Sequence, residues 1–265
     1  MNTYYNVGKI LSDAGKHYGE GIIKEYSRKL TVELGKGYTF TSLTRMKKFY
    51  MLIEKVATVS QQLSYGHYIE LLPFDNLNQI KYYIKIVEEQ SLSIRQLREK
   101  IKSKEYERLP EDAKNKLSNN KKLEVDDLVK NPILIKNSCD YEIISEKVLH
   151  KLIMEDIESF MKELGASFCF IGSEYKIKIG DRYNYIDLLL FNIDFNCYVV
   201  VELKINELKK EYIGQIQIYM NYIDLNLKKI NHDRTIGIIV CRYNNEYVIE
   251  YCSDDRIISR EYELV

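Results

Sequence analysis

Two apolar segments in the C-terminal half constrain the fold of this 265-residue chain more than any other feature. Residues 183–192 (YNYIDLLLFN) and 197–205 (CYVVVELKI) are rich in β-branched, aliphatic and aromatic side chains, and only the four residues IDFN separate them. Short apolar runs of this composition, bounded by a turn, are typical of buried strands. We therefore predict two strong strands joined by a short turn.

Three charged residues interrupt these strands: Asp187, Glu202 and Lys204. Side chains alternate along a strand, so Glu202 and Lys204 are expected to project from the same face. A buried carboxylate is costly unless it finds a cation or hydrogen-bond donors. Two acids and a lysine on adjacent apolar strands form a self-consistent set if a divalent metal ion lies between them.

This set is suited to metal-assisted hydrolysis of a phosphodiester. The carboxylates of Asp187 and Glu202 and the carbonyl of Leu203 are oxygen ligands of the kind that Mg²⁺ prefers. Such an ion lowers the pKa of a bound water, and Lys204 would orient that water and stabilise the transition state. The alternative is a surface ion pair, because an isolated E-x-K carries little information in a chain that is 29% charged.

A helix predicted around residues 213–227 adds a second signal. Gln215 and Tyr219 stand four residues apart and share one helical face, where they would flank the site as further catalytic residues. The alternative is that Tyr219 belongs to the core and Gln215 to the surface.

The remaining pattern of this half predicts a mixed α/β layer with the order α-β-β-β-α-β-β. The first helix is expected to end at Gly165. The other segments are an amphipathic helix over 144–165, one bent strand or a hairpin over 167–180, and strands over 235–243 and 247–253.

Residues 1–105 have a helical pattern and carry 17 Lys/Arg against 11 Asp/Glu. We predict a helix that stops at Gly35-Lys36-Gly37, a second one capped by Thr41 or Ser42, and a last one capped by Ser93. Residues 20–56 fit a helix-turn-helix whose second helix binds nucleic acid through the basic side chains Arg45, Lys47 and Lys48. A structural bundle with a basic outer face, or a dimerisation or partner-binding face, fits equally.

The composition changes between these halves. The polar stretch SKEYERLPEDAKNKLSNNKKLEVDD separates them, so we expect a helical module over 1–105, a linker over 106–140 and an α/β domain over 141–265.

The C-terminal segment resembles a known family. EYKIKIGDRYNYIDLLLFNIDFNCYVVVELKINELKKEYIGQIQIYMNYID, residues 174–224, is similar to the C-terminal nuclease domain of the YhcG-type family, which looks like the PD-(D/E)XK nucleases. The motifs that carry the resemblance are IDL at 186–188, ELK at 202–204, GQ-x-x-x-Y at 214–219, ELG at 163–165 and F-x-G at 170–172. In the N-terminal half, TSLTRMKKFY, LSYGHYIELL and LSIRQLREKIKSKEYERL resemble the family's helical module.

The resemblance implies a restriction-endonuclease-like α-β-β-β-α-β core behind an all-helical N-terminal domain. It further implies a DNA endonuclease that depends on Mg²⁺, with Mn²⁺ as the alternative, and that acts in defence against foreign DNA or in its processing. A homodimer would supply two sites for cutting both strands.

The sequence departs from the family in three places: His150 stands where a glutamate is usual, Glu174 where a glutamine is usual, and Tyr65 where a tryptophan is usual. Glu146 and Glu155 are nearby acids that would compensate for His150. These departures keep two alternatives open, a nuclease-fold protein that only binds DNA or assembles, and a subunit active only with a partner.

The rest of the composition narrows the setting. The five cysteines form no C-x-x-C and no zinc spacing with the four histidines, which is typical of free thiols in a reducing compartment. Neither a signal peptide nor a membrane-spanning apolar run is indicated. We therefore expect a cytoplasmic protein, with no membrane partner.

Overall fold

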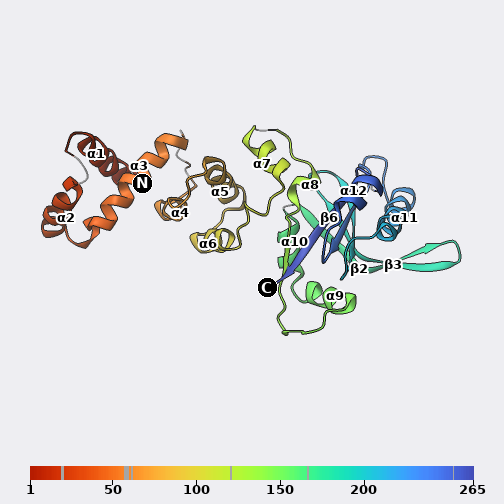
Figure 1. Cartoon of the computed structure of the whole chain (residues 1–265). Coiled ribbons are helices and arrows are strands. Elements are labelled where there is room, and N and C mark those ends of the chain that lie inside the picture. Colours follow the sequence, from red (N-terminus) through yellow and green to blue (C-terminus); the bar gives the residue numbers. More distant parts are fainter. Residues whose placement is uncertain (19–20, 57–59, 61, 120, 166, 253) are drawn as a thin grey trace. The chain divides into compact units, whose positions relative to one another are not determined.

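The chain divides into two compact units, Met1–Glu107 and Arg108–Val265 (Figure 1). The computed structural model describes residues 1–265 apart from 19–20, 57–59, 61, 120, 166 and 253.

The N-terminal unit is helical, as the sequence predicts. Its described elements are α1 (Asn2–Tyr18), α2 (Gly21–Leu34), the 3₁₀ turn η1 (Lys36–Tyr38), α3 (Phe40–Val56), α4 (Tyr65–Leu71), α5 (Leu77–Gln90) and α6 (Ile94–Lys102). Helices α1, α2 and α3 share a core built on Leu11, Ile23, Leu43 and Met46. Gly8 allows α1 and α3 to approach closely, because a Cβ there would lie 2.1 Å from the carbonyl oxygen of Met46.

Of the two helix caps predicted in this unit, one is confirmed and one is wrong. Ser93 caps α6, since its Oγ accepts a hydrogen bond from the backbone N–H of Gln96 at 3.3 Å. The prediction for α3 was wrong: the helix begins at Phe40, and Thr39 Oγ1 accepts from the N–H of Ser42 at 3.3 Å. The side chain that precedes a helix caps it, and the apolar stripe alone places this helix two residues too late.

The C-terminal unit has the predicted α/β architecture with helices on both faces of one sheet (Figure 1). Its elements are α7 (Glu111–Ser118), α8 (Val125–Leu128), β1 (Ile133–Ile135), α9 (Glu146–Glu155), α10 (Ile157–Leu164), β2 (Phe168–Ile179), β3 (Arg182–Asn192), β4 (Cys197–Leu203), α11 (Lys210–Asn226), β5 (Ile236–Cys241), α12 (Glu246–Cys252) and β6 (Ile257–Leu264). The sheet order is β1-β6-β5-β4-β3-β2. Strands β2, β3 and β4 are antiparallel, whereas β4, β5, β6 and β1 are parallel.

The sequence of strand β4 is almost entirely apolar because the strand is buried on both faces. Val199 and Val201 face the core that α9 and α10 cover, and Val200 faces the core that α11 covers. A strand buried on both faces needs apolar side chains at successive positions. The predicted α-β-β-β-α-β order is therefore realised by α9–α10, β2, β3, β4, α11 and β5.

The expected linker over 106–140 is instead structured where the chain is described. It contains α7, α8 and the edge strand β1, which pairs with β6. Val125, Val129 and Ile133 are buried in the core. These apolar residues are four positions apart, but lysines and asparagines dominate the composition of the segment. Composition alone therefore indicated a linker.

A buried ion pair holds this segment to the helices. The guanidinium of Arg108 donates to the carboxylate of Glu163 on α10 and to the carbonyl of Pro132. Glu163 Oε2 also accepts from the N–H of Leu134 in β1 at 3.0 Å. Glu163 therefore joins the edge strand to α10.

Two further expectations for the C-terminal half were wrong. The helix expected over 144–165 is two helices, because Asp156 ends α9 and caps α10 by accepting from the N–H of Ser159 at 3.1 Å. The strand expected over 247–253 is helix α12 over its described residues, residue 253 lying outside them. Val248 and Ile249 pack on the core while Tyr247 and Tyr251 are each 74% exposed, a helical rather than an alternating pattern. The last strand is β6.

Segment 167–180 is one long strand, β2, with an irregularity between Phe170 and Gly172. Helix α10 ends at Gly165, whose φ of 121° is favourable only for glycine.

Candidate active site

The β3–β4 pairing brings the two predicted carboxylates together. Leu188 pairs with Val201 in antiparallel register, so Asp187 lies opposite Glu202. Asp187 Oδ2 accepts a hydrogen bond from the N–H of Leu203 at 2.8 Å, and Glu202 Oε1 accepts from the N–H of Asp187 at 3.5 Å. Each carboxylate is thus oriented by the backbone of the opposite strand.

Lys204 completes this group. Its Nζ donates to Glu202 Oε2 at 3.2 Å, as the shared strand face predicts. The residues Glu202 and Lys204 are 1% and 6% exposed, which rules out the surface ion pair that the sequence left open. The Nζ also lies 5.3 Å from the centre of the Tyr212 ring on α11.

Burial and mutual charge perturb these groups. Burial, and next the negative charge of Asp187, raises the pKa of Glu202 to about 7. Burial also raises the pKa of Asp187, against the opposing effects of the Leu203 N–H and of Lys204. Burial alone would lower the pKa of Lys204, but the charges of Glu202, Glu146 and Asp187 outweigh it and raise that pKa. Lys204 therefore keeps its positive charge, and it favours the ionised form of the two neighbouring carboxyl groups only in part.

Helix α11 places Gln215 and Tyr219 beside the group. Gln215 Nε2 donates to Tyr219 Oη at 3.1 Å. Tyr219 is 6% exposed, and burial raises the pKa of its hydroxyl, to which the charge of Glu202 adds. Tyr219 is buried, as the core alternative expected, yet it lies within electrostatic reach of the acids.

Tyr212 is a neighbour of the site that was not identified from the sequence. It stands seven residues before Tyr219, two helical turns along the same face of α11. That spacing was the available signal.

Helix α9 contributes a second set of groups. The charge of Glu146 acts on Lys204, and the charge of His150, four residues later, acts on Asp187. The Nε2 atom of His150 is buried and has no hydrogen-bond partner among the residues that the structure describes. Glu155 instead pairs with Lys151 at 3.7 Å. Of the two acids expected to compensate for His150, Glu146 is the one within reach of the site.

Glu174 is a further acid near the site, although the sequence motifs did not place it there. Ser173 pairs with Leu188 and Tyr175 with Ile186, so Glu174 lies opposite Asp187 on β2. Its φ of 46° is unusual for a residue with a side chain. Its negative charge raises the pKa of Asp187.

The three basic residues predicted to bind nucleic acid, Arg45, Lys47 and Lys48, lie on α3. Arg45 and Lys48 are exposed and Lys47 is half-buried. The hydrogen bond from Arg98 lowers the pKa of Glu70, and the charge of Arg45 adds to this effect. These residues belong to the N-terminal unit.

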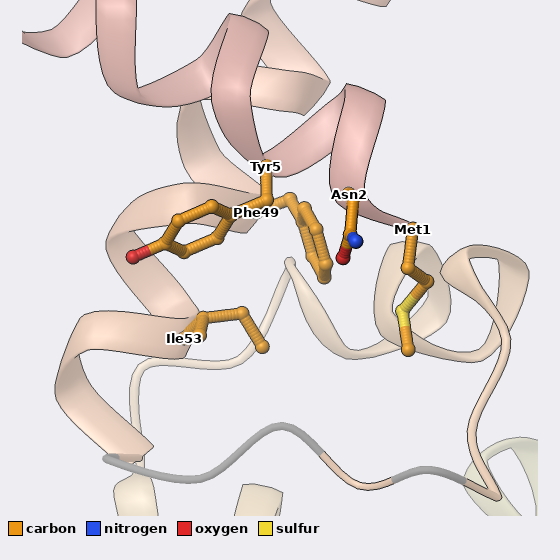
Figure 2. Close-up of a pocket in the computed structure, with 5 residues that line it drawn as sticks. All are labelled: Met1, Asn2, Tyr5, Phe49 and Ile53. Atoms are coloured by element: carbon orange, nitrogen blue, oxygen red, sulfur yellow. The ribbon is translucent and has the colours of Figure 1, made fainter.

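A hollow of about 240 Å³ in the N-terminal unit lies between α1 and α3 (Figure 2). Met1, Asn2, Tyr5, Phe49 and Ile53 line it. None of these described lining residues is an acid, a lysine or a histidine. Among the described residues, no helix is long and apolar enough to cross a membrane.

Residues 127–264, more than half of the chain, match the family described as the YhcG PDDEXK nuclease domain. The chain belongs to this nuclease family. Residues 1–108 match the DUF1016 N-terminal domain, in agreement with the resemblance of the helical module. Asp187, Glu202 and Lys204 thus lie within the part of the chain that matches a nuclease domain.

The chain is also similar to individual proteins. It is 24% identical to "Putative nuclease YhcG" of Escherichia coli (strain K12), over 90% of this chain and 76% of that one. Solved structures that match include a repair endonuclease from Pyrococcus abyssi, with 22% identity and a TM-score of 0.32. An EndoMS–dsDNA2 complex matches with 21% identity and a TM-score of 0.32. Each match covers 48% of this chain, which spans about half the length of these solved chains.

Proposed function

We propose that the C-terminal unit hydrolyses phosphodiester bonds of DNA with a divalent metal ion, and that Asp187, Glu202 and Lys204 carry the reaction. The observation that carries this proposal is the buried Glu202–Lys204 pair facing Asp187 across two apolar strands. A sheet core does not otherwise favour such a group, because each buried charge is costly, by several kcal/mol in order of magnitude, unless it is compensated. Membership in a nuclease family supports the same chemistry.

The residues fit a hard divalent cation. The carboxylates of Asp187 and Glu202 and the carbonyl of Leu203 would hold it, as oxygen ligands suit Mg²⁺ or, as the alternative, Mn²⁺. Burial, and next the charge of Asp187, raises the pKa of Glu202 to about 7 despite the nearby Lys204, so a cation bound at the two acids would favour their ionised form. Among the described residues, no third acid, histidine or cysteine joins them as a ligand group. When bound, such an ion lowers the pKa of a coordinated water and offsets charge on the phosphate.

The protein's own groups act around that centre. Lys204 is protonated at neutral pH, because its pKa is raised, so it orients the attacking water and stabilises negative charge on the phosphate. Tyr219 keeps its proton and accepts from Gln215, so its hydroxyl hydrogen is available to an acceptor such as a phosphate oxygen. Asp187 is held by the Leu203 N–H and thereby fixes the position of the carboxylates.

The test is cleavage of supercoiled, linear, single-stranded and branched DNA, and of RNA, by the full chain with Mg²⁺, Mn²⁺ or EDTA. Asp187→Ala, Glu202→Ala and Lys204→Ala are each expected to lower the rate at least about 100-fold. Glu211→Ala, an exposed acid at the start of α11, is the matched control and retains activity. Circular dichroism of each variant is the check that it folds. Unchanged cleavage by all three site variants would refute the proposal.

The same assay separates the alternatives. Metal binding and DNA binding without turnover on any substrate would identify a binding or assembly protein. Turnover that appears only with added cellular proteins would identify a subunit that needs a partner. The role we propose in defence against foreign DNA, or in its processing, rests on the family resemblance. A homodimer would supply the two sites needed for double-strand cleavage.

For the N-terminal unit, we propose that Arg45, Lys47 and Lys48 on α3 contact the phosphate backbone. Replacing all three with glutamine is expected to reduce the dependence of DNA affinity on salt. The logarithmic slope should fall by about 0.9 for each phosphate that is no longer neutralised. An unchanged slope would assign α3 to a structural or partner-binding role.

A further inference from the structure

The distal parts of β2 and β3 form a two-stranded arm. These strands pair from Phe168–Asn192 to Ile179–Arg182, whereas β4 accompanies β3 only over Leu188–Asn192. Residues 175–186 therefore extend past the other strands as a hairpin, which Figure 1 shows projecting from the sheet. We call residues 175–186 the arm.

One face of the arm is anchored. Ile177 and Ile186 are 2% and 0% exposed and belong to the core beneath α11. The partly buried Tyr175 and Ile179 pack against the same core. A hairpin held along one face has a fixed geometry, so the opposite face is presented in a defined arrangement.

The opposite face carries two lysines and two tyrosines. Lys176 pairs in register with Tyr185, and Lys178 with Tyr183. Tyr183 and Tyr185 are 57% and 53% exposed, and both lysines are exposed. The Nζ of Lys176 lies 3.8 Å from the centre of the Tyr183 ring. Packing of the sheet does not require these rings, because the buried face already anchors the arm.

The chemistry of this face matches nucleic acid. The arm holds three basic residues against one acid, Asp181. Cationic groups next to exposed rings are the combination that binds a single strand, where lysines follow the phosphates and rings stack on bases. Residues two apart on a strand are about 6.7 Å apart, twice the roughly 3.4 Å step of a stacked DNA strand. Neighbouring bases of a stacked strand are too close together for each ring to stack on one of them. The two rings therefore fit an extended strand with separated bases better than a stacked duplex.

The arm also leads directly to the carboxylates. Tyr185 stands two residues before Asp187 on β3, and Lys176 two residues after Glu174 on β2. The arm is therefore continuous with the two strands that carry Asp187 and Glu174.

We propose that the arm is a contact for an unpaired nucleic-acid segment, with Tyr183 and Tyr185 as stacking platforms and Lys176 and Lys178 as phosphate contacts. This inference rests on the proposed function, since it assigns a substrate-binding surface to that site. It predicts that single-stranded or branched substrates bind more tightly than duplex.

The test measures fluorescence anisotropy of labelled single-stranded DNA, its duplex and single-stranded RNA with the full chain in EDTA, where no cleavage occurs. Tyr183→Ala and Tyr185→Ala are each expected to weaken single-strand binding at least about fivefold, and the phenylalanine variants to retain it. Lys176→Gln with Lys178→Gln is expected to reduce the logarithmic salt slope by about 1.4. Comparison of DNA with RNA identifies the sugar that the arm accepts.

Matched controls come from exposed residues elsewhere in the same unit. Tyr247→Ala and Tyr251→Ala remove rings that are 74% exposed on α12, and Lys121→Gln with Lys122→Gln removes two exposed lysines. These controls are expected to bind like wild type. Equal affinity of the arm variants and wild type, or equal weakening by the controls, overturns the inference.

The two proposals fail differently. If wild type cleaves but the arm variants bind and cleave as wild type does, the arm inference is wrong and the proposed function stands. If no substrate is cut but the arm variants lose single-strand affinity, the arm inference stands and the proposed function is wrong.

Discussion

Replacing Glu202 with glutamine is expected to abolish activity and yet to stabilise the metal-free protein. Burial, and next the charge of Asp187, raises the pKa of Glu202 from an ordinary 4.5 to about 7. Ionisation of this carboxyl therefore opposes folding. At about 1.4 kcal/mol for each tenfold change in proton affinity, a side chain that cannot ionise recovers roughly 3 kcal/mol at most.

The sign follows from proton binding. Between about pH 4.5 and pH 7 the folded protein holds the Glu202 proton that the unfolded chain has released. Stability of the metal-free protein therefore falls as the pH rises through this window. Asp187 acts in the same direction, since its pKa is raised too. Loss of the charge partner of Lys204 offsets part of the gain, so we expect Glu202→Gln to gain about 1–2 kcal/mol near pH 8 and almost nothing near pH 5.

The assay is urea unfolding in EDTA near pH 5 and pH 8, followed by circular dichroism because the chain contains no tryptophan. The two units can unfold at different urea concentrations, so the unfolding transition of each unit is fitted separately. Glu211→Gln, at an exposed acid, is the control and should follow wild type. A Glu202→Gln protein that is less stable than wild type near pH 8, or that keeps the wild-type dependence on pH, would refute this reasoning.

Three further predictions test other parts of the structure. Gly8→Ala is expected to destabilise the N-terminal unit by about 1–3 kcal/mol in urea unfolding, because its Cβ would lie 2.1 Å from the carbonyl oxygen of Met46; an unchanged midpoint would disprove the close approach. Glu163→Ala is expected to cost about 3 kcal/mol in urea unfolding, since it removes the carboxylate that balances the charge of the buried Arg108 guanidinium, whereas Glu158→Ala, at a side chain 80% exposed, should cost less than about 1 kcal/mol. Saturating Mg²⁺ at about 100 times its Kd should stabilise wild type by about 2.7 kcal/mol in thermal unfolding and leave Asp187→Asn nearly unchanged; equal shifts in both would place the ion elsewhere.

The sequence by itself determined those elements that depend only on residues close together in the chain. Residues 188–190 and 199–203 are buried on both faces of the sheet, and the apolar runs that contain them were recognisable as strands. Period-two alternation placed Glu202 and Lys204 on one face, and their hydrogen bond follows from it. Ser93 was identifiable as a cap because a capping hydroxyl bonds to a backbone three residues away. In each case the physical cause acts over a few residues.

Only the tertiary structure decided the features that depend on distant partners. Val125, Val129 and Ile133 become core because β1 pairs with β6 at the far end of the chain. Residues 246–252 become helix because one side packs on the core, and their composition favours a strand equally well.

The surroundings of the site were likewise decided by tertiary contacts. Glu174 comes to lie opposite Asp187 through strand register, and α9 brings Glu146 and His150 within electrostatic reach of Lys204 and Asp187. Register and helix packing join residues that are tens of positions apart, and no local pattern encodes such contacts. The sequence thus identified the two acids and the lysine, and the packing of the sheet decided which other groups surround them.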